Sequence, residues 1–248
     1  VPLVLKFDTG MNRLGIKCND VTKVIEMLRG CGRNSIDHLM THFACSYYRS
    51  KENDRTSKQY NEFKIIKEKF ISSQISVKNT SVSNSGAIEQ GIGLEESHIR
   101  PGLMLYGPQS TMSKERLWHS LNISSLESAY IKKSYVKKGT PIGYGATPVH
   151  CAGTLLVLPI GYGDGFLNFY SGAAVNYKHF TGRVVGRVNM DLTFVLFEDV
   201  AIEEFSELDL INFWDHDPKK IENLSMQLKT IPYQLFCGIS SRIPRIYL

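Results

Sequence analysis

The first half of the chain alternates short apolar runs with amphipathic segments, a pattern typical of β/α proteins. Residues 1–7, VPLVLKF, are predicted to form a fully buried parallel strand that ends in the polar turn Asp8-Thr9-Gly10. A helix should begin at Asn19 or Asp20 and end at Gly30. Its buried face would consist of Val21, Val24, Ile25 and Leu28. Strand, turn and helix therefore form the first repeating unit.

The same alternation continues to about residue 121. A strand end is expected over 38–44, and the charged, serine-rich residues 46–57 should form a flexible loop. A helix follows, with an inner face formed by Tyr60, Phe63, Ile66 and Phe70. The remaining elements are a strand and loop over 72–87, a short helix over 89–97 and a strand over 99–106. We therefore predict part of a (β/α)8 barrel over residues 1–121.

Residues 122–248 show a different pattern, in which short strands are punctuated by glycine. These strands are predicted over 125–136, 153–160, 173–175, 182–190 and 192–197. A single helix is expected over 222–228, and the chain should end on a strand that carries Tyr247. The second domain is therefore predicted to consist mostly of β-strands.

Composition narrows the class of protein. The 248 residues are 42% hydrophobic and 21% charged, which is ordinary for a globular protein, and no apolar run is long enough to cross a bilayer. The net charge of +5 is spread along the chain, so we expect neither a nucleic-acid partner nor a membrane partner. Five cysteines without CxxC spacing favour a reducing cytoplasm and predict no metal site.

Lys6 and Arg13 flank the first turn. A lysine within an apolar strand requires an anionic partner or a modification, and an arginine can hold a carboxylate through two parallel hydrogen bonds. An isolated pair of this kind is more often structural, with the lysine reaching solvent. The pair alone therefore only suggests a small anionic ligand.

Eight motifs in order give that suggestion more weight. They are KFDTGMNRLG (6–15), THFA (41–44), SNSGA (83–87), RPGLMLYG (100–107), GYGAT (143–147), LPIGYGDG (158–165), GRVNMD (186–191) and RIPRIY (242–247). Together they span nearly the whole chain, which resembles alanine racemase, a family of pyridoxal phosphate enzymes that interconvert L- and D-alanine. The resemblance implies a barrel followed by a β domain.

The resemblance also implies a catalytic mechanism that uses two bases. Tyr144 matches a base that reaches the cofactor site of a neighbouring subunit, so we expect a homodimer with shared active sites. His42 and Arg100 match a polar relay, and Arg100 also matches the arginine that faces the pyridine nitrogen of pyridoxal 5'-phosphate. A tyrosine near neutral pH needs help from such cations, because its ordinary pKa is about 10.

Further matches imply the binding groups. The cofactor-binding residues would be Asn84, Ser85, Gly102, Leu103, Tyr247 and Arg100. The substrate-binding residues would be Arg13, the Met190 amide, Asp191 beside it, and Tyr162 at the entrance. Lys6 matches a lysine that carries a carbamate in many members. Asn168 stands where several members have a basic residue, which leaves the charge at the entrance open.

One element of the family pattern is not found in this sequence. The lysine that forms the Schiff base with the cofactor lies, in the family, before the motif that begins here at Lys6. We therefore expect a truncated or split chain that is poorly soluble and inactive unless the N-terminal segment is supplied.

Three other functions stay open. A serine or broad-specificity racemase would share these catalytic groups, because selectivity depends on the width near Tyr162. A related barrel decarboxylase is less favoured, since Arg13 is suited to holding a carboxylate. A non-catalytic product of a split or decayed gene would explain the absent lysine, although the joint retention of Tyr144, Arg100, Ser85 and Tyr247 argues against long decay.

Overall fold

The computed structural model describes residues 1–48, 54–111, 118–166 and 170–247. The chain divides into two compact units. Unit 1 comprises Val1–Leu105 and Gln109–Ser120, and unit 2 comprises Tyr106–Pro108 and Leu121–Leu248. Part of the loop expected over 46–57, and Asn168, lie outside the described residues. Among the described helices, none combines the length and the apolar character needed to cross a bilayer.

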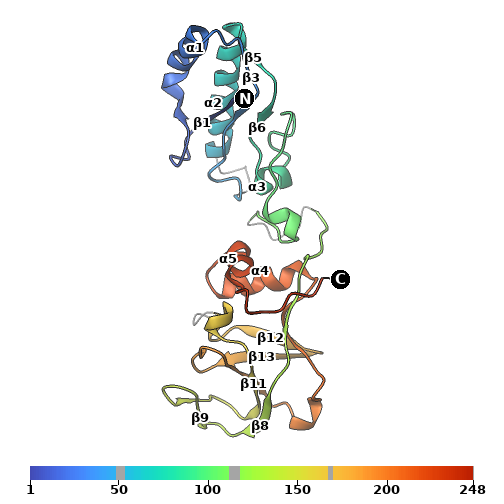
Figure 1. Ribbon diagram of the computed structural model, residues 1–248. Helices are drawn as coiled ribbons and strands as arrows, with labels where there is room; N and C mark the ends of the chain where they lie inside the picture. The colour runs from blue at the N-terminus through green and yellow to red at the C-terminus, as the bar shows by residue number, and fades with distance from the viewer. Residues whose placement is uncertain (49–53, 112–117, 167–169, 248) are drawn as a thin grey trace. The chain divides into compact units, whose positions relative to one another are not determined.

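Unit 1 contains a parallel four-stranded sheet in the order β2-β1-β4-β6. Its strands are β1 (Val4–Asp8), β2 (Ile16–Lys17), β4 (His38–Met40) and β6 (Thr80–Ser81). Two of its strands, β1 and β6, are labelled in Figure 1. A second parallel pair joins β3 (Ser35–Ile36) to β5 (Ser76–Val77). The helices α1 (Val21–Gly30) and α2 (Asp54–Ser72) connect consecutive strands, so the predicted β/α alternation is confirmed.

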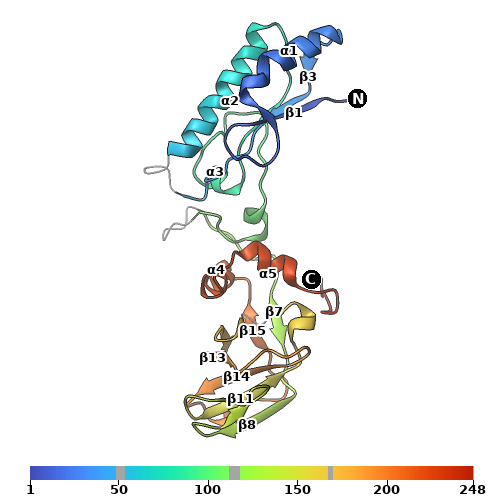
Figure 2. The same cartoon turned by 90° about the vertical axis from the view of Figure 1, so that its left-hand side faces the viewer.

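The helices pack on the sheet with the faces that the sequence predicts. Val21, Ile25 and Leu28 of α1 are buried, as are all four expected residues of α2, and Phe7 and Leu39 join them in one apolar core. The Phe7 and Phe70 rings meet edge to face with centroids 5.9 Å apart. Figure 2 shows α1 and α2 lying side by side. Burial of these faces from water stabilises the half-barrel.

Three details of unit 1 differ from the sequence prediction. Strand β1 is only partly buried, because Leu3, Leu5 and Phe7 face the helices whereas Val4 is 56% exposed. The short helix is α3 (Ser85–Glu89), not residues 89–97, where Gly91 and Gly93 adopt positive φ and turn the chain. No strand covers 99–106 within the described chain. Instead, His98 makes an isolated bridge to Ser81, and a 3-10 helix, η2, spans Leu103–Tyr106.

Unit 2 is built on an antiparallel seven-stranded sheet in the order β7-β15-β12-β13-β14-β11-β8. Its strands are β7 (Leu126–Ser128), β8 (Lys132–Val136), β11 (Gly153–Leu158), β12 (Ala174–Tyr177), β13 (Phe180–Val185), β14 (Thr193–Glu198) and β15 (Ile211–Trp214). A separate hairpin pairs β9 (Pro141–Ile142) with β10 (Thr147–Pro148). The mostly β domain is therefore confirmed.

Strand β11 is buried along its whole length because apolar clusters cover both faces of the sheet. Leu156 and Leu158 join the larger cluster, whereas Leu155 joins a smaller one with Ile142 and Val149. Ile142 lies in β9 and Val149 directly follows β10, so their burial packs the β9–β10 hairpin against the sheet. The hairpin tip therefore projects from a fixed base.

The end of unit 2 also differs from the prediction. Two helices occur in place of one, α4 (Pro218–Gln227) and α5 (Pro232–Gly238), each with a proline in its first turn. The Trp214 ring of β15 meets Phe236 of α5 edge to face at 6.2 Å. Residues 244–247 are irregular, so the expected final strand is wrong. Strand β13 ends at Val185, because Gly186 adopts a positive φ of 68°.

Candidate active site

The turn after β1 is held by one carboxylate. Asp8 Oδ1 accepts hydrogen bonds from the backbone amides of Gly10, Met11 and Asn12 at 3.0, 2.9 and 2.9 Å. Burial alone would raise the pKa of Asp8, but these amides outweigh it and hold the pKa below its usual range. The turn thus presents Arg13 from a backbone fixed by an ionised carboxylate.

A buried polar network links this turn to residues 41–44. Thr9 Oγ1 and Thr41 Oγ1 lie 2.8 Å apart, and Gln59 of α2 bridges the two segments. Its Oε1 accepts from the Ala44 amide at 2.8 Å, and its Nε2 donates to the His42 carbonyl at 3.1 Å. We did not predict Gln59 from the sequence, yet it precedes Phe63 by one helical turn and so shares the inner face. The sequence signal that could have indicated Gln59 was a polar residue at a position on the inner face of the helix.

Arg100 lies at the centre of a hydrogen-bonded cluster in unit 1. Its guanidinium donates to Ser81 Oγ, to the Thr41 carbonyl at 2.6 Å and to the Val82 carbonyl at 3.4 Å. His42 Nδ1 lies 3.5 Å from the same guanidinium. Burial lowers the pKa of Arg100, although an arginine stays charged. The side chain is therefore a fixed positive charge beside His42.

Three positive charges affect the pKa of His42. Burial and, after it, the charges of Arg100, Arg13 and Lys6 lower the pKa of His42 to about 4. The imidazole is therefore neutral near neutral pH. The structure brings these four sequence-predicted residues into one electropositive region, which we call the cationic cluster. Such a region suits an anionic ligand.

Four of the expected phosphate-binding residues lie in unit 1, on the turn into α3 and on the segment that leads into η2. Ser85 is buried, and its Oγ accepts from the amides of Gly102 at 2.8 Å and Met104 at 3.4 Å. Asn84 Oδ1 accepts from the Ala87 amide at 3.2 Å and from Ser46 Oγ at 2.5 Å. Leu103 is buried at the start of η2. Hydrogen bonds between these two segments thus hold Ser85 next to the backbone of residues 102–104.

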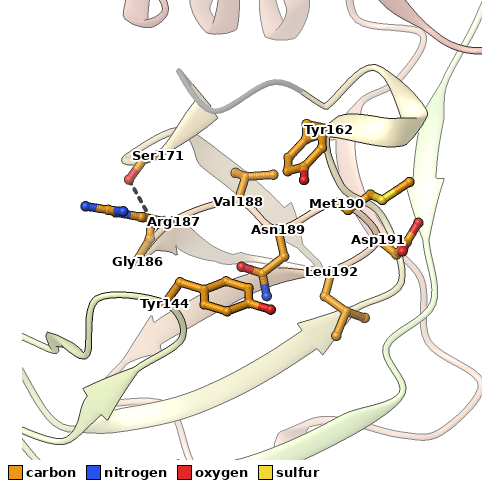
Figure 3. Close-up of a pocket in the computed structure, with 10 residues that line it drawn as sticks. All are labelled: Tyr144, Tyr162, Ser171, Gly186, Arg187, Val188, Asn189, Met190, Asp191 and Leu192. Atoms are coloured by element: carbon orange, nitrogen blue, oxygen red, sulfur yellow. Dashed lines mark hydrogen bonds between the residues drawn. The ribbon is translucent and has the colours of Figure 1, made fainter.

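Unit 2 contributes a pocket of about 890 Å³ (Figure 3). It is lined by Tyr144, Tyr162, Ser171, Gly186, Arg187, Val188, Asn189, Met190, Asp191 and Leu192. Four of these were predicted as site residues: Tyr144, Tyr162, Met190 and Asp191. Tyr144 stands at the tip of the β9–β10 hairpin and is 72% exposed. The pocket therefore collects three separate sequence motifs of unit 2.

Backbone contacts fix the Tyr162 turn against the Met190 turn. The Tyr162 amide donates to the Asn189 carbonyl and the Gly163 amide to the Met190 carbonyl, both at 2.9 Å. A Cβ at Gly161 would lie 2.3 Å from the Asn189 oxygen, so the close approach requires glycine. These contacts hold the two turns together.

Arg242 joins the same two turns, although its sequence motif alone predicts no role for it. Its Nη2 donates to Asp191 Oδ1 at 2.6 Å, and its Nε lies 3.4 Å from Asp164 Oδ1. Asp164 in turn accepts from the Gly161 amide at 2.9 Å through its other oxygen. The sequence feature that could have indicated this role is the position of Arg242 at the start of the RIPRIY motif.

The predicted residues therefore fall into two sets. Unit 1 holds Lys6, Arg13, His42, Asn84, Ser85, Arg100, Gly102 and Leu103, and unit 2 holds Tyr144, Tyr162, Met190, Asp191 and Tyr247. Tyr247 lies apart from the hairpin on the irregular C-terminal segment and is 88% exposed.

Comparison with protein families decides the relationship. Residues 1–110 match the model of the alanine racemase N-terminal domain, and residues 123–247 match that of the C-terminal domain. The chain belongs to the alanine racemase family. The resemblance drawn from the motifs is thereby confirmed.

Individual alanine racemases agree with this assignment. Alanine racemase 2 of Caldanaerobacter subterraneus subsp. tengcongensis is 30% identical over 254 residues, which cover 98% of this chain and 63% of that protein. The chain thus spans less than two thirds of that relative. A solved alanine racemase of Clostridium difficile 630 is 28% identical, with a TM-score of 0.81 over 99% of this chain and 64% of its own.

A third relative supports the fold alone. It is an alanine racemase from Bartonella henselae described with covalently bound pyridoxal phosphate, 24% identical, with a TM-score of 0.83 over 100% of this chain and 66% of its own. The partial (β/α)8 barrel and the following β domain are therefore the fold of alanine racemase structures.

Proposed function

We propose that this chain is part of a pyridoxal phosphate-dependent alanine racemase, an enzyme that interconverts L- and D-alanine by a two-base mechanism. The observation that carries the proposal is the cationic cluster of unit 1, where a neutral His42 lies 3.5 Å from Arg100 and within the influence of the Arg13 and Lys6 charges. Its members occupy the family motifs of a chain that belongs to alanine racemase. A phosphorylated cofactor and an amino-acid carboxylate would both be attracted to such a charge.

The donor set of unit 1 fits pyridoxal phosphate. Arg100 would face the ring nitrogen with a permanent cation, since oxygen acceptors from two segments, Thr41 and Ser81–Val82, hold its guanidinium in place. Ser85 and the amides of Gly102 and Leu103 would hold the phosphate, with Asn84 supporting the turn and Tyr247 adding a hydroxyl. When bound, pyridoxal phosphate delocalises the charge left at the α-carbon after proton removal.

The substrate carboxylate would be held by Arg13 and by the amide of Met190. Arg13 stands on a turn whose backbone is fixed by Asp8, and Met190 on one pinned by the Tyr162 turn. Such fixed donors orient a substrate without further loss of entropy. Asp191 and Tyr162 would line the entrance and favour a small side chain. Lys6 would brace Arg13, as a carbamate or as a free amine.

Tyr144 would act as one of the two bases, moving a proton between its Oη and the α-carbon. Its exposure at a hairpin tip is suited to reaching into the site of a second copy of the chain. We therefore propose a homodimer in which unit 2 of one subunit completes the site on unit 1 of the other. His42, neutral and next to Arg100, would relay charge toward Tyr144 without adding a second full cation.

The proposal also assigns the two domains and the setting. Residues 1–121 would form the cofactor-binding half-barrel and residues 122–248 the β domain that carries Tyr144. The enzyme would act in the cytoplasm on free alanine and supply D-alanine for peptidoglycan. None of the five cysteines, all of which lie in the described residues, forms a disulfide, which is compatible with a reducing compartment.

Deuterium exchange tests this function. The longest in-frame product that contains this chain should form D-alanine from L-alanine in heavy water, with deuterium at the α-carbon, when pyridoxal phosphate is added. Tyr144→Phe should lower that rate by a factor of about 100 or more, since general-base catalysis contributes roughly that much. L-Serine, run in parallel, would reveal a broader substrate range.

Tyr135→Phe is the matched control, because Tyr135 is also an exposed tyrosine of unit 2, on β8. It should retain the full rate. A soluble protein that carries pyridoxal phosphate but exchanges no α-proton would contradict the proposed activity.

A further inference from the structure

Three metal-ligand side chains converge in unit 2, and none of them is among the residues that line the pocket in Figure 3. His150 and Cys151 follow β10, and Glu198 ends β14. One ligand atom from each of the three lies within 4.8 Å of the other two, and His150 Nε2 lies 4.0 Å from Glu198 Oε1. The absence of CxxC spacing led us to expect no metal, but strand pairing brings these distant residues together.

The backbone around this group is fixed on both sides. Strands β11 and β14 pair with Gly153 opposite Glu198, and the Asp199 amide donates to the Ala152 carbonyl at 3.1 Å. A Cβ at Gly153 would lie 2.2 Å from the Phe197 oxygen, so the two strands approach as closely as glycine permits. The segment that carries Cys151 therefore stays in register with Glu198.

The segment is also fixed before His150. The buried Val149 exchanges backbone hydrogen bonds with the turn after β8, accepting from Gly139 at 2.8 Å and donating to Thr140 at 3.0 Å. The three ligand side chains thus start from anchored backbone, while His150 and Glu198 keep exposed, adjustable side chains.

We propose that His150, Cys151 and Glu198 bind a Zn²⁺ ion. Imidazole nitrogen, thiolate sulfur and carboxylate oxygen are the ligands that Zn²⁺ takes in proteins. Tetrahedral bonds of about 2.0 to 2.3 Å place ligand atoms roughly 3.5 Å apart. The three ligand atoms lie within 4.8 Å of one another, so small side-chain rotations would bring them to that distance. Three protein ligands leave the fourth position to water.

Binding would release one proton. The Cys151 S–H bond breaks, its proton goes to solvent, and the thiolate sulfur donates its electron pair to Zn²⁺. The bound ion would join the segment after β10 to the end of β14, at the base of the hairpin that carries Tyr144. The site is independent of the proposed racemase activity.

Spectroscopic titration tests the site. Co²⁺ added to the chain under reducing conditions should bind one ion and give the charge-transfer absorption of a thiolate–Co²⁺ bond, which stoichiometric Zn²⁺ should abolish. Cys151→Ser should remove the band, and His150→Ala or Glu198→Gln should weaken binding about tenfold or more. Affinity should rise with pH because a thiol proton is displaced.

Matched controls are available in unit 2. Cys237→Ser replaces a second cysteine of unit 2, on α5, and His179→Ala replaces an exposed histidine between β12 and β13. Both should bind as tightly as the unmodified chain, and circular dichroism should show that all variants are folded. The proposal is overturned if no thiolate band forms, or if the band is lost in Cys237→Ser and retained in Cys151→Ser.

Discussion

The two units hold their site residues in different ways. In unit 1, side-chain hydrogen bonds fix the site residues: Arg100 is hydrogen-bonded to two segments, and the partly buried His42 lies beside it. In unit 2, backbone contacts fix the turns while the side chains project outward. Tyr144 is 72% exposed and Met190 is 53% exposed.

The contrast suggests that unit 1 binds the cofactor and that unit 2 supplies a base to another copy of the chain. A charge that must hold a cofactor in one orientation benefits from rigid, dehydrated partners. A base that acts on a site formed by another surface must instead project from a rigid support. The exposed groups of unit 2 therefore support the proposal that a second copy of the chain completes each site.

The largest expected effect concerns the backbone support of unit 2. Gly165 has a φ of +95°, and a Cβ there would lie 1.9 Å from the Gly238 oxygen. Gly165→Ala should lower the free energy of unfolding by about 3 kcal/mol or more, since strain and overlap add. Urea denaturation followed by fluorescence measures the loss.

Gly172→Ala provides the comparison, because Gly172 has a similar φ of +85° but nothing within 4 Å of the added Cβ. That variant should cost only about 1 to 2 kcal/mol, the penalty of the left-handed conformation itself. Equal losses for the two variants would show that the close approach at Gly165 does not support the turn.

A smaller effect is expected from the ion pairs that join the pocket turns. Arg242→Met removes the contacts to Asp191 and Asp164, which should misplace the Met190 amide and lower kcat/KM for alanine about tenfold. Arg245→Met is the control, since the hydrogen bonds that Arg245 makes within the described chain go to backbone carbonyls of its own segment. Steady-state kinetics of the active enzyme distinguish the two. If Arg242→Met leaves kcat/KM unchanged, the ion pairs do not position the pocket.

The smallest effect concerns the charge of His42. Its pKa of about 4 lies below the ordinary value of 6.5, so the cluster contributes less to folded stability as the pH falls through that interval. Arg100→Met should raise the pKa of His42, because burial and then the Arg100 charge are the main causes of the shift. NMR titration of the histidine ring measures the change.

Arg100→Lys tests the electrostatic part of that explanation. It keeps a positive charge near His42 and should leave the pKa closer to that of the unmodified chain. If both variants shift the pKa equally, the Arg100 charge is not the cause.

The sequence predicted the elements whose apolar periodicity was strong. The inner faces of α1 and α2 were correct because each buries side chains at helical spacing against one sheet. The elements that failed were short or governed by single residues: Asn84 starts α3 earlier than expected, and the proline at the start of α5 adds a second helix to the end of unit 2.

The candidate site was predictable residue by residue, but the supports around it were not. The motifs identified His42 and Arg100, and the structure brings them together. Gln59 and Arg242 act through contacts with segments far away in the sequence, and no local pattern indicates such partners. The grouping of His150 and Cys151 with Glu198 likewise depends on the β11–β14 register.

Subunit complementation tests the central claim, that units 1 and 2 of different copies form one active site. Arg13→Met removes a unit 1 group and Tyr144→Phe a unit 2 group, and each variant alone should be nearly inactive. Both substituted residues are exposed, so both variants should fold. After the two are mixed and allowed to exchange subunits, about half the dimers should be mixed, each with one intact site, restoring about a quarter of the original activity. No restored activity in verified mixed dimers would contradict the account and place both groups in a site formed by one chain.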